Sequence, residues 1–158
     1  MSSAVNLLLA FSIGIVAGLR SLTAPAVVAW AGYLGWIDLS ASPLAFMGSA
    51  WAVGICTLLA LFELVTDQLP KTPARTEAVP LAARIVTGLL SGACVGVAGG
   101  SSLWLGALLG AVGGIAGAFG GYRARVGLVQ GLHVPDFAIA IPEDLIAIGF
   151  GLLIVSRF

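Results

Sequence analysis

The chain has 158 residues, of which 59% are hydrophobic and only 9% are charged, and its formal net charge is zero. A soluble domain usually carries about 25% charged residues, whereas the mean hydropathy here is +1.10. These values argue against a soluble protein, and the balanced charge gives no reason to expect a nucleic-acid partner. The length suits one compact transmembrane domain, which we predict to cover residues 1–158.

The first two apolar stretches lie on either side of Arg20. Residues 4–19 have no Lys or Arg before them and no small-residue cleavage pattern, so we expect a retained helix rather than a signal peptide. Residues 24–37 number only 14, which is too short for a span, and they predict a re-entrant or interfacial half-helix. Ser21 or Thr23 could cap its first turn.

The third stretch, residues 43–63, is long enough for one full span. It ends in Glu63, and Asp67 follows four residues later, which places both carboxylates on one helix face. The polar connection at residues 67–80 holds three prolines and predicts a loop. We expect Arg84 to open the helix that follows this loop.

Residues 85–122 form a run of 38 residues without one charge. As a single α-helix this run would be about 57 Å long, whereas the hydrocarbon core of a bilayer is about 30 Å thick. The run must therefore fold back on itself. Its turn signal is the Gly-Gly-Ser-Ser sequence at residues 99–102, which predicts two spanning helices joined by a hairpin.

The last apolar stretch, residues 139–158, contains two adjacent acids near its start. A span needs about 20 residues, so Glu143 and Asp144 fall inside the last span rather than beyond it. Pro142 suits the first turn of a helix and predicts that the helix begins there. Simple capping of that helix end would explain the acids, but we favour a protected polar cavity, because two carboxylates at this depth need partners.

Basic residues are concentrated in two predicted loops, residues 67–80 and 123–135, which flank one helical hairpin. Both segments must therefore face the same side, and the positive-inside rule predicts that this side is cytoplasmic. We expect a multi-pass protein of the inner (plasma) membrane with a cytoplasmic N-terminus. The predicted fold is an all-α polytopic helix bundle of about four full spans plus a short re-entrant or broken segment.

Glycines recur every four residues along three of the predicted helices, a spacing that aligns them on one face and allows close backbone approach. This pattern is typical of a glycine zipper. We expect packing mainly within one chain, and also a homo-oligomer, because a bundle this small often needs a partner to enclose a site. The three rows are Gly14 and Gly18; Gly88, Gly92, Gly96 and Gly100; and Gly113, Gly117 and Gly121.

Charged residues near the helix ends are the candidates for a substrate- or ion-binding site, because charges inside a membrane are costly and usually functional. Arginine presents a fixed fork of donors that can hold a carboxylate. The default for Arg125 and Arg157 is snorkelling to headgroups. No metal cluster, cofactor motif or nucleophile–base pair is present in the sequence. The predicted site comprises Arg20, Glu63, Asp67, Arg84, Arg123, Glu143 and Asp144.

Three segments together resemble a bacterial integral-membrane family of unknown function: GLRSLTAPAVVAW at residues 18–30, FELVTDQLPKTPART at 62–76, and PDFAIAIPEDLIAIGFGLL at 135–153. The resemblance covers most of the chain. It implies a small polytopic inner-membrane protein but brings no activity. It also implies a polar motif set of Arg20, Glu63, Asp67, Pro70, Arg75, Arg84, Asp136, Glu143 and Asp144.

Three functions fit these features. The first is a small transporter or channel for an ion or small polar solute, with a site lined by carboxylates and arginines. The second is an intramembrane enzyme acting on a lipid or headgroup, with Glu143 or Asp144 as its acid or base; it ranks lower because no nucleophile or metal accompanies them. The third is a packing or assembly subunit, for which the glycine faces alone would suffice.

Overall fold

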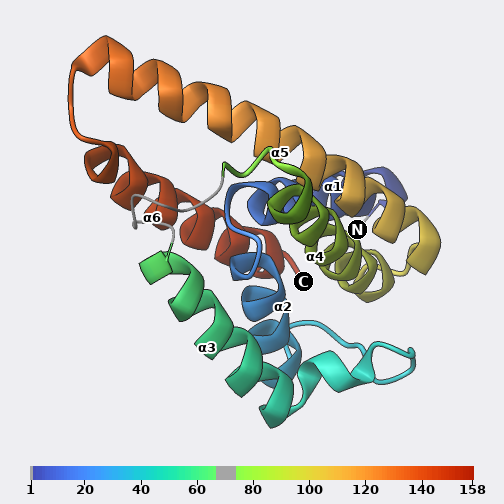
Figure 1. The fold of residues 1–158 in the computed structure, drawn as a ribbon. Helices are drawn as coiled ribbons and strands as arrows, with labels where there is room; N and C mark the ends of the chain where they lie inside the picture. Colours follow the sequence, from blue (N-terminus) through green and yellow to red (C-terminus); the bar gives the residue numbers. More distant parts are fainter. Residues whose placement is uncertain (1, 67–73) are drawn as a thin grey trace.

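The computed structural model describes residues 2–66 and 74–158. This part of the chain is helical and contains no strand (Figure 1). Three helices, α4, α5 and α6, are long and apolar enough to cross a membrane, while α1 and α3 are apolar but shorter. The elements are α1 (Ser3–Leu19), α2 (Thr23–Tyr33), the 3-10 helix η1 (Ala45–Gly48), α3 (Ala50–Thr66), α4 (Ala78–Ala98), α5 (Leu103–Leu132) and α6 (Asp136–Val155).

The number of full-length spans is smaller than predicted. Residues 43–63, expected to form one span, instead contribute to η1 and to the 17-residue α3. The segment predicted as a half-helix at residues 24–37 contains the 11-residue α2, most of whose residues are buried. The uncharged run does fold into two helices, α4 and α5, which are joined at residues 99–102 as predicted.

Helix boundaries differ from the predictions at both basic segments. The expected loop at residues 123–135 is mostly helix, because α5 continues to Leu132, and arginine is a good helix former. The helix ends where His133 adopts a left-handed conformation, with φ of 53°, two residues before Pro135. Helix α6 begins at Asp136, so Pro142 lies inside this helix and does not start it.

Helices α1, α4 and α5 form a tightly packed group, which we call the three-helix unit. Both α1 and α4 contact α5 closely at Gly110. A Cβ added to Gly14 of α1 would lie 2.2 Å from Gly110 O, and one added to Gly88 of α4 would lie 2.5 Å from the same oxygen. Backbones therefore touch along both faces of α5. Gly100, predicted to continue the glycine row that starts at Gly88, instead lies in the turn after α4, with φ of 73°.

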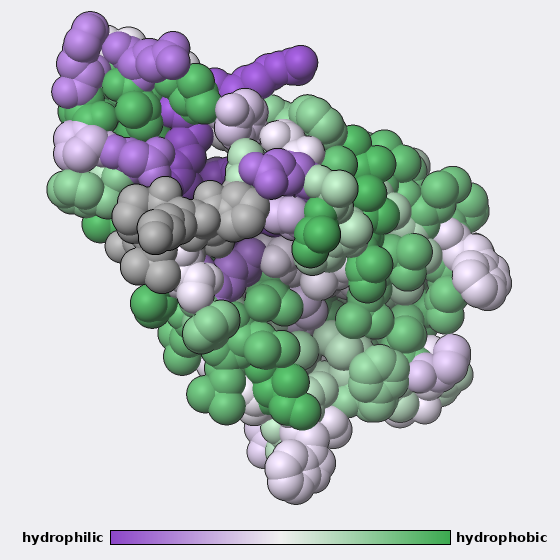
Figure 2. All heavy atoms as spheres, viewed as in Figure 1, coloured by the Kyte–Doolittle hydropathy of each residue, from purple (hydrophilic) through white to green (hydrophobic). Residues whose placement is uncertain are grey.

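Helices α2 and α6 pack against this unit, and α3 packs against α2; we call these three the outer helices (Figure 1). Helix α2 is mostly buried, and Val27 on it meets Gly151 of α6. Within the described part of the chain, α3 buries Val53 and Glu63 alone. Much of the visible surface is hydrophobic, and hydrophilic side chains gather toward the end where α5 leads into α6 (Figure 2). The exterior therefore suits hydrocarbon surroundings over most of this face.

Helix α1 runs antiparallel to α4. Near its start, Asn6 donates from Nδ2 to Gly96 O at 2.8 Å. Near its end, Gly18 O accepts a hydrogen bond from Arg84 Nε at 3.1 Å. The N-terminus therefore lies at the end of the bundle that carries the 99–102 turn, while Arg20 lies at the end that carries Arg84. The sequence predicts the N-terminus on the side of the basic segments, whereas the structure places it at the end of the bundle opposite Arg84, which binds Gly18 O at the end of α1.

Candidate functional site

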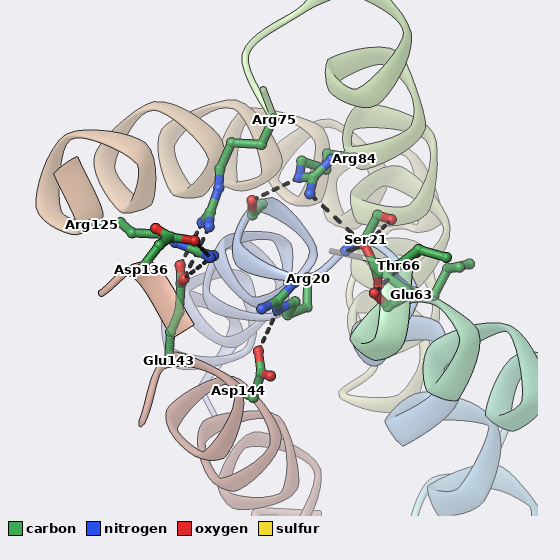
Figure 3. A network of polar contacts seen from close by, with 12 residues as sticks. Arg20, Ser21, Glu63, Thr66, Arg75, Arg84, Arg125, Asp136, Glu143 and Asp144 are labelled. Atoms are coloured by element: carbon green, nitrogen blue, oxygen red, sulfur yellow. Dashed lines mark hydrogen bonds and ion pairs between the residues drawn. The ribbon is translucent and has the colours of Figure 1, made fainter. Parts of the chain in front are cut away.

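Arg20 and Asp144 form a buried ion pair at the centre of the candidate site (Figure 3). Arg20 directly follows α1, and its side chain is 0% exposed. Its Nε donates to Asp144 Oδ1 at 2.5 Å. Asp144 lies in the interior of α6, well inside a candidate span. The contact thus places a compensated pair of charges where a single charge would be costly.

Glu143 is held by two arginines from different elements. Arg75, three residues before α4, donates from Nη1 to Oε1 at 2.5 Å and from Nη2 to Oε2 at 2.9 Å. This two-point grip is the geometry in which a guanidinium binds a carboxylate best. Arg125 of α5 donates from Nη1 to Glu143 Oε2 at 3.3 Å, and its Nε donates to Asp136 at 2.9 Å. Arg125 therefore joins the interior of α6 to its first residue.

Glu63 binds the two residues directly before α2. Its Oε1 accepts hydrogen bonds from the Ser21 backbone N at 2.8 Å and from Ser21 Oγ at 2.6 Å, and its Oε2 accepts one from Leu22 N at 2.8 Å. A carboxylate is favoured there because the start of a helix carries a partial positive charge. The hydroxyl cap predicted from Ser21 or Thr23 is not formed, since Ser21 donates its hydroxyl to Glu63.

Arg84 connects the carboxylate of α3 to the end of α1. Its Nη2 lies 3.9 Å from Glu63 Oε1, its Nε donates to Gly18 O, and its Nη1 donates to Pro80 O at 3.0 Å. The expectation that Arg84 opens its helix is wrong, because α4 already begins at Ala78. Its position inside the helix directs the side chain toward the break between α1 and α2.

These contacts form three groups of ion pairs, which together we call the ion-pair network, and the charges are divided simply within it. The arginines belong to the three-helix unit or to the segment directly before α4, whereas the acids belong to the outer helices α3 and α6. Each of these ion pairs therefore joins an outer helix either to the unit or to the segment directly before α4. The network comprises Arg20, Arg75, Arg84, Arg125, Glu63, Asp136, Glu143 and Asp144.

Five of the residues predicted for the site lie in this network, namely Arg20, Glu63, Arg84, Glu143 and Asp144. The other two predicted residues are not among the described members of the network. Arg123 is exposed and makes none of the network's ion pairs, and Asp67 falls outside the described residues, as do Pro70 and Lys71.

Two arginines of the network, Arg75 and Arg125, are not among the residues predicted for the site. Arg125 was expected to snorkel, yet it binds Glu143. Residues two apart on a helix point about 200° away from each other, so Arg123 and Arg125 cannot face the same side of α5. The glycine row Gly113, Gly117 and Gly121 continues in steps of four to position 125, and this was the signal that marks the inward-facing arginine. Arg75, named by the resemblance alone, had no helix period to place it.

The ion-pair network is built from arginines and carboxylates. Within residues 2–66 and 74–158, no group of three His, Cys, Asp or Glu side chains could hold a metal ion. Arginine stays protonated in proteins, so the carboxylates are the members that can take up a proton or pair with an entering cation. A separate cavity of about 210 Å³ lies between α2, α3 and α6, and its lining contains none of the network's carboxylates.

A family model described as a domain of unknown function (DUF4126) matches residues 7–156. No curated protein and no solved structure matches the chain. The matched range contains the whole ion-pair network and all six helices except the first residues of α1.

Proposed function

The chain belongs to this DUF4126 family, and we propose that it is a small membrane transporter or channel that moves an ion or small polar solute at the ion-pair network. The observation that carries the proposal is the pair of Arg20, which is fully buried, and Asp144, which lies inside a candidate span. Ionisable residues inside a membrane commonly mark the path of an ion or a proton.

The division of charge between two groups of helices supports this proposal. The three-helix unit is held by backbone contacts between glycines, which leave little freedom for relative movement. The outer helices meet this unit through carboxylates that bind its arginines. A proton or cation that neutralises these carboxylates weakens the contact, and the two groups then shift relative to each other. Movement of one helical body against another around a central site is a common basis of transport.

The two alternative functions draw less support. A packing subunit needs the glycine contacts but has no need for Arg20 or Asp144 at buried positions, where charge is costly. For an enzyme acting on lipids, substrate would have to reach a catalytic carboxylate from the bilayer. The apolar cavity that lies among the outer helices is lined by none of the network's acids.

For the placement in the membrane, we propose an inner-membrane protein whose network end faces the cytoplasm. The exposed Arg123 lies close to this end along α5, and positive charge is retained on the cytoplasmic side. The 99–102 turn and the N-terminus then face the opposite side. A homo-oligomer is part of the proposal because a bundle this small often needs a partner to enclose a site, and the exposed face of α3 with Trp51, Leu58 and Phe62 is open to such a contact.

Reconstitution into liposomes tests the proposed function. Flux would be followed with an internal pH-sensitive dye under a potassium gradient set by valinomycin, and then with sodium, potassium and chloride gradients. We expect liposomes that contain the native protein to show a higher flux of at least one of these ions than empty liposomes. The Asp144→Asn variant should lose that flux. Asp38→Asn, which changes an exposed acid bonded to Ser40 outside the network, should retain it. No flux of any tested ion, or full flux through Asp144→Asn, would contradict the proposal.

A further inference from the structure

Gly121 lies on α5 beside the most densely paired part of the network. A Cβ added at this position would lie 2.8 Å from Arg75 Nη1 and 3.3 Å from Glu143 Oε1. It would also lie 2.5 Å from Leu19 Cδ2. The Arg75–Glu143 ion pair therefore occupies the space that any other residue at position 121 would fill.

We propose that Gly121 is a positioning residue of the network: its lack of a side chain creates the space in which Arg75 grips Glu143 within reach of Arg125. The link from this geometry to transport rests on the proposed function, whereas the geometric role of Gly121 does not.

The helix period explains why the space and the second arginine occur together. Gly121 and Arg125 are four residues apart and so share one face of α5. Arg125 reaches Glu143 Oε2 at 3.3 Å from this face, and the space at Gly121 admits Arg75 to the same carboxylate. One face of α5 thus supplies one arginine directly and makes room for another from the segment before α4.

Gly121 differs from the glycines that set the spacing between helices. A Cβ at Gly110 would lie 2.1 Å from the Gly88 carbonyl oxygen, and one at Gly117 would lie 2.4 Å from the Ile15 carbonyl oxygen. Those neighbours are backbone atoms that cannot move without separating the helices. The neighbours of Gly121 are the ends of side chains, two of which belong to an ion pair. A methyl group at position 121 should therefore displace the ion pair rather than the helices.

The adjacent glycine provides a matched control. A Cβ added at Gly120 would meet nothing within 4 Å, and it lies on the same helix. Gly120→Ala and Gly121→Ala thus make the same chemical change with the same gain in helix propensity. Any difference between the two variants reports the surroundings of position 121.

The test measures the coupling between Arg75 and Glu143 by a double-mutant cycle on the full chain in detergent, with Arg75→Gln, Glu143→Gln and both together. Thermal unfolding midpoints are compared in the native, Gly120→Ala and Gly121→Ala backgrounds. We expect the native and Gly120→Ala backgrounds to show the same coupling and the Gly121→Ala background to show almost none. Equal coupling in both alanine backgrounds would overturn the proposal.

Two further measurements distinguish displacement of the ion pair from steric contact with Leu19 and from a general failure to fold. If Leu19→Ala restores full coupling to Gly121→Ala, then contact with Leu19 explains the effect and the proposal fails. If Gly121→Ala alone does not fold, it is compared in an Arg75→Ala background, where removal of the guanidinium should let it fold as well as the control does; failure to fold there also overturns the proposal.

Liposome flux is recorded for the same alanine variants. We expect it to fall in Gly121→Ala and to be retained in Gly120→Ala. Flux by Gly121→Ala equal to that of the control would remove Gly121 from the transport site. If the native protein moves no ion, the proposed function fails, while the coupling experiment still decides the geometric role.

Discussion

Arg20 Nε donates a hydrogen bond to Asp144 Oδ1 at 2.5 Å, although 124 positions separate the two residues in the chain. Arg20 directly follows the first helix and Asp144 lies inside the last one, so this contact ties the two ends of the fold together. Because Arg20 is fully buried, loss of its partner carboxylate would leave a charge in poorly solvated surroundings.

The first prediction concerns the stability of this pair. Asp144→Leu should lower the free energy of unfolding by about 3–5 kcal/mol, because it leaves the Arg20 charge without this counter-charge. The double variant Arg20→Met/Asp144→Leu should recover part of that loss, since no charge of the pair remains. Chemical unfolding in detergent micelles measures both effects.

The control for this prediction is Arg123→Gln, at an exposed arginine outside the network. It should change the free energy of unfolding by no more than about 0.5 kcal/mol. A cost for Asp144→Leu as small as that of the control would show that the pair is not desolvated as its burial indicates.

The second prediction concerns the carboxylate at the start of α2. Glu63→Gln keeps the shape of the side chain but replaces one acceptor oxygen with a donor, which then faces the donors of Ser21 or Leu22. We expect a loss of about 1–3 kcal/mol in the free energy of unfolding. We also expect faster hydrogen exchange at the amides of these two residues, which mass spectrometry can measure.

The exposed Asp38, which accepts hydrogen bonds only from Ser40 in the described residues, provides the comparison for Glu63. Asp38→Asn should leave exchange at Ser21 and Leu22 unchanged. Unaltered exchange in Glu63→Gln as well would mean that the carboxylate does not secure the residues that lead into α2.

Much of the helical arrangement could be predicted because membrane thickness limits what an uncharged run can do. The length of residues 85–122 required a hairpin, and the two helices do turn at residues 99–102. The same argument of length placed Glu143 and Asp144 inside the last candidate span, where they lie. Constraints of this kind act along the chain and need no knowledge of neighbouring helices.

The direction and partners of the polar side chains could not be obtained in this way. The basic segment after the hairpin was treated as a loop, so the helical period that separates Arg123 from Arg125 was not applied. The side of the N-terminus follows from counting crossings, and that count differs from the structure because α3 ends where α2 begins, with Glu63 bound to Ser21. Contacts such as that between Arg84 and Gly18 depend on packing between helices far apart in the sequence.

The third prediction concerns the glycines of the three-helix unit. Gly110→Ala should destabilise the protein, because the new Cβ would lie 2.1 Å from Gly88 O and the backbones would have to separate. We expect a cost of about 1–3 kcal/mol, as for other substitutions that overfill a packed site. Gly149→Ala, at a helical glycine with nothing within 4 Å, should instead be neutral or stabilise by up to about 1 kcal/mol.

Thermal unfolding of the two glycine variants in the same detergent distinguishes these outcomes. Opposite signs for Gly110→Ala and Gly149→Ala are expected. If both substitutions raise the unfolding midpoint, helix propensity dominates and the close approach at Gly110 does not occur in the folded protein.

The last prediction concerns the two ends of the molecule in the membrane. The hydrogen bond from Asn6 to Gly96 places the start of α1 beside the 99–102 turn, whereas Arg123 lies far along α5 from that turn. In a background with Cys56 and Cys94 replaced by alanine, single cysteines at the exposed positions Ser2 and Ser102 should therefore react alike with a membrane-impermeant thiol reagent added to intact cells. Arg123→Cys should react only after the cells are opened, because the positive-inside rule places this end in the cytoplasm. Labelling of Arg123→Cys alone in intact cells would reverse the proposed orientation and leave the fold unchanged. Opposite labelling of Ser2→Cys and Ser102→Cys is the more serious result, because it would contradict the antiparallel packing of α1 and α4 on which the position of Arg20 in the network depends.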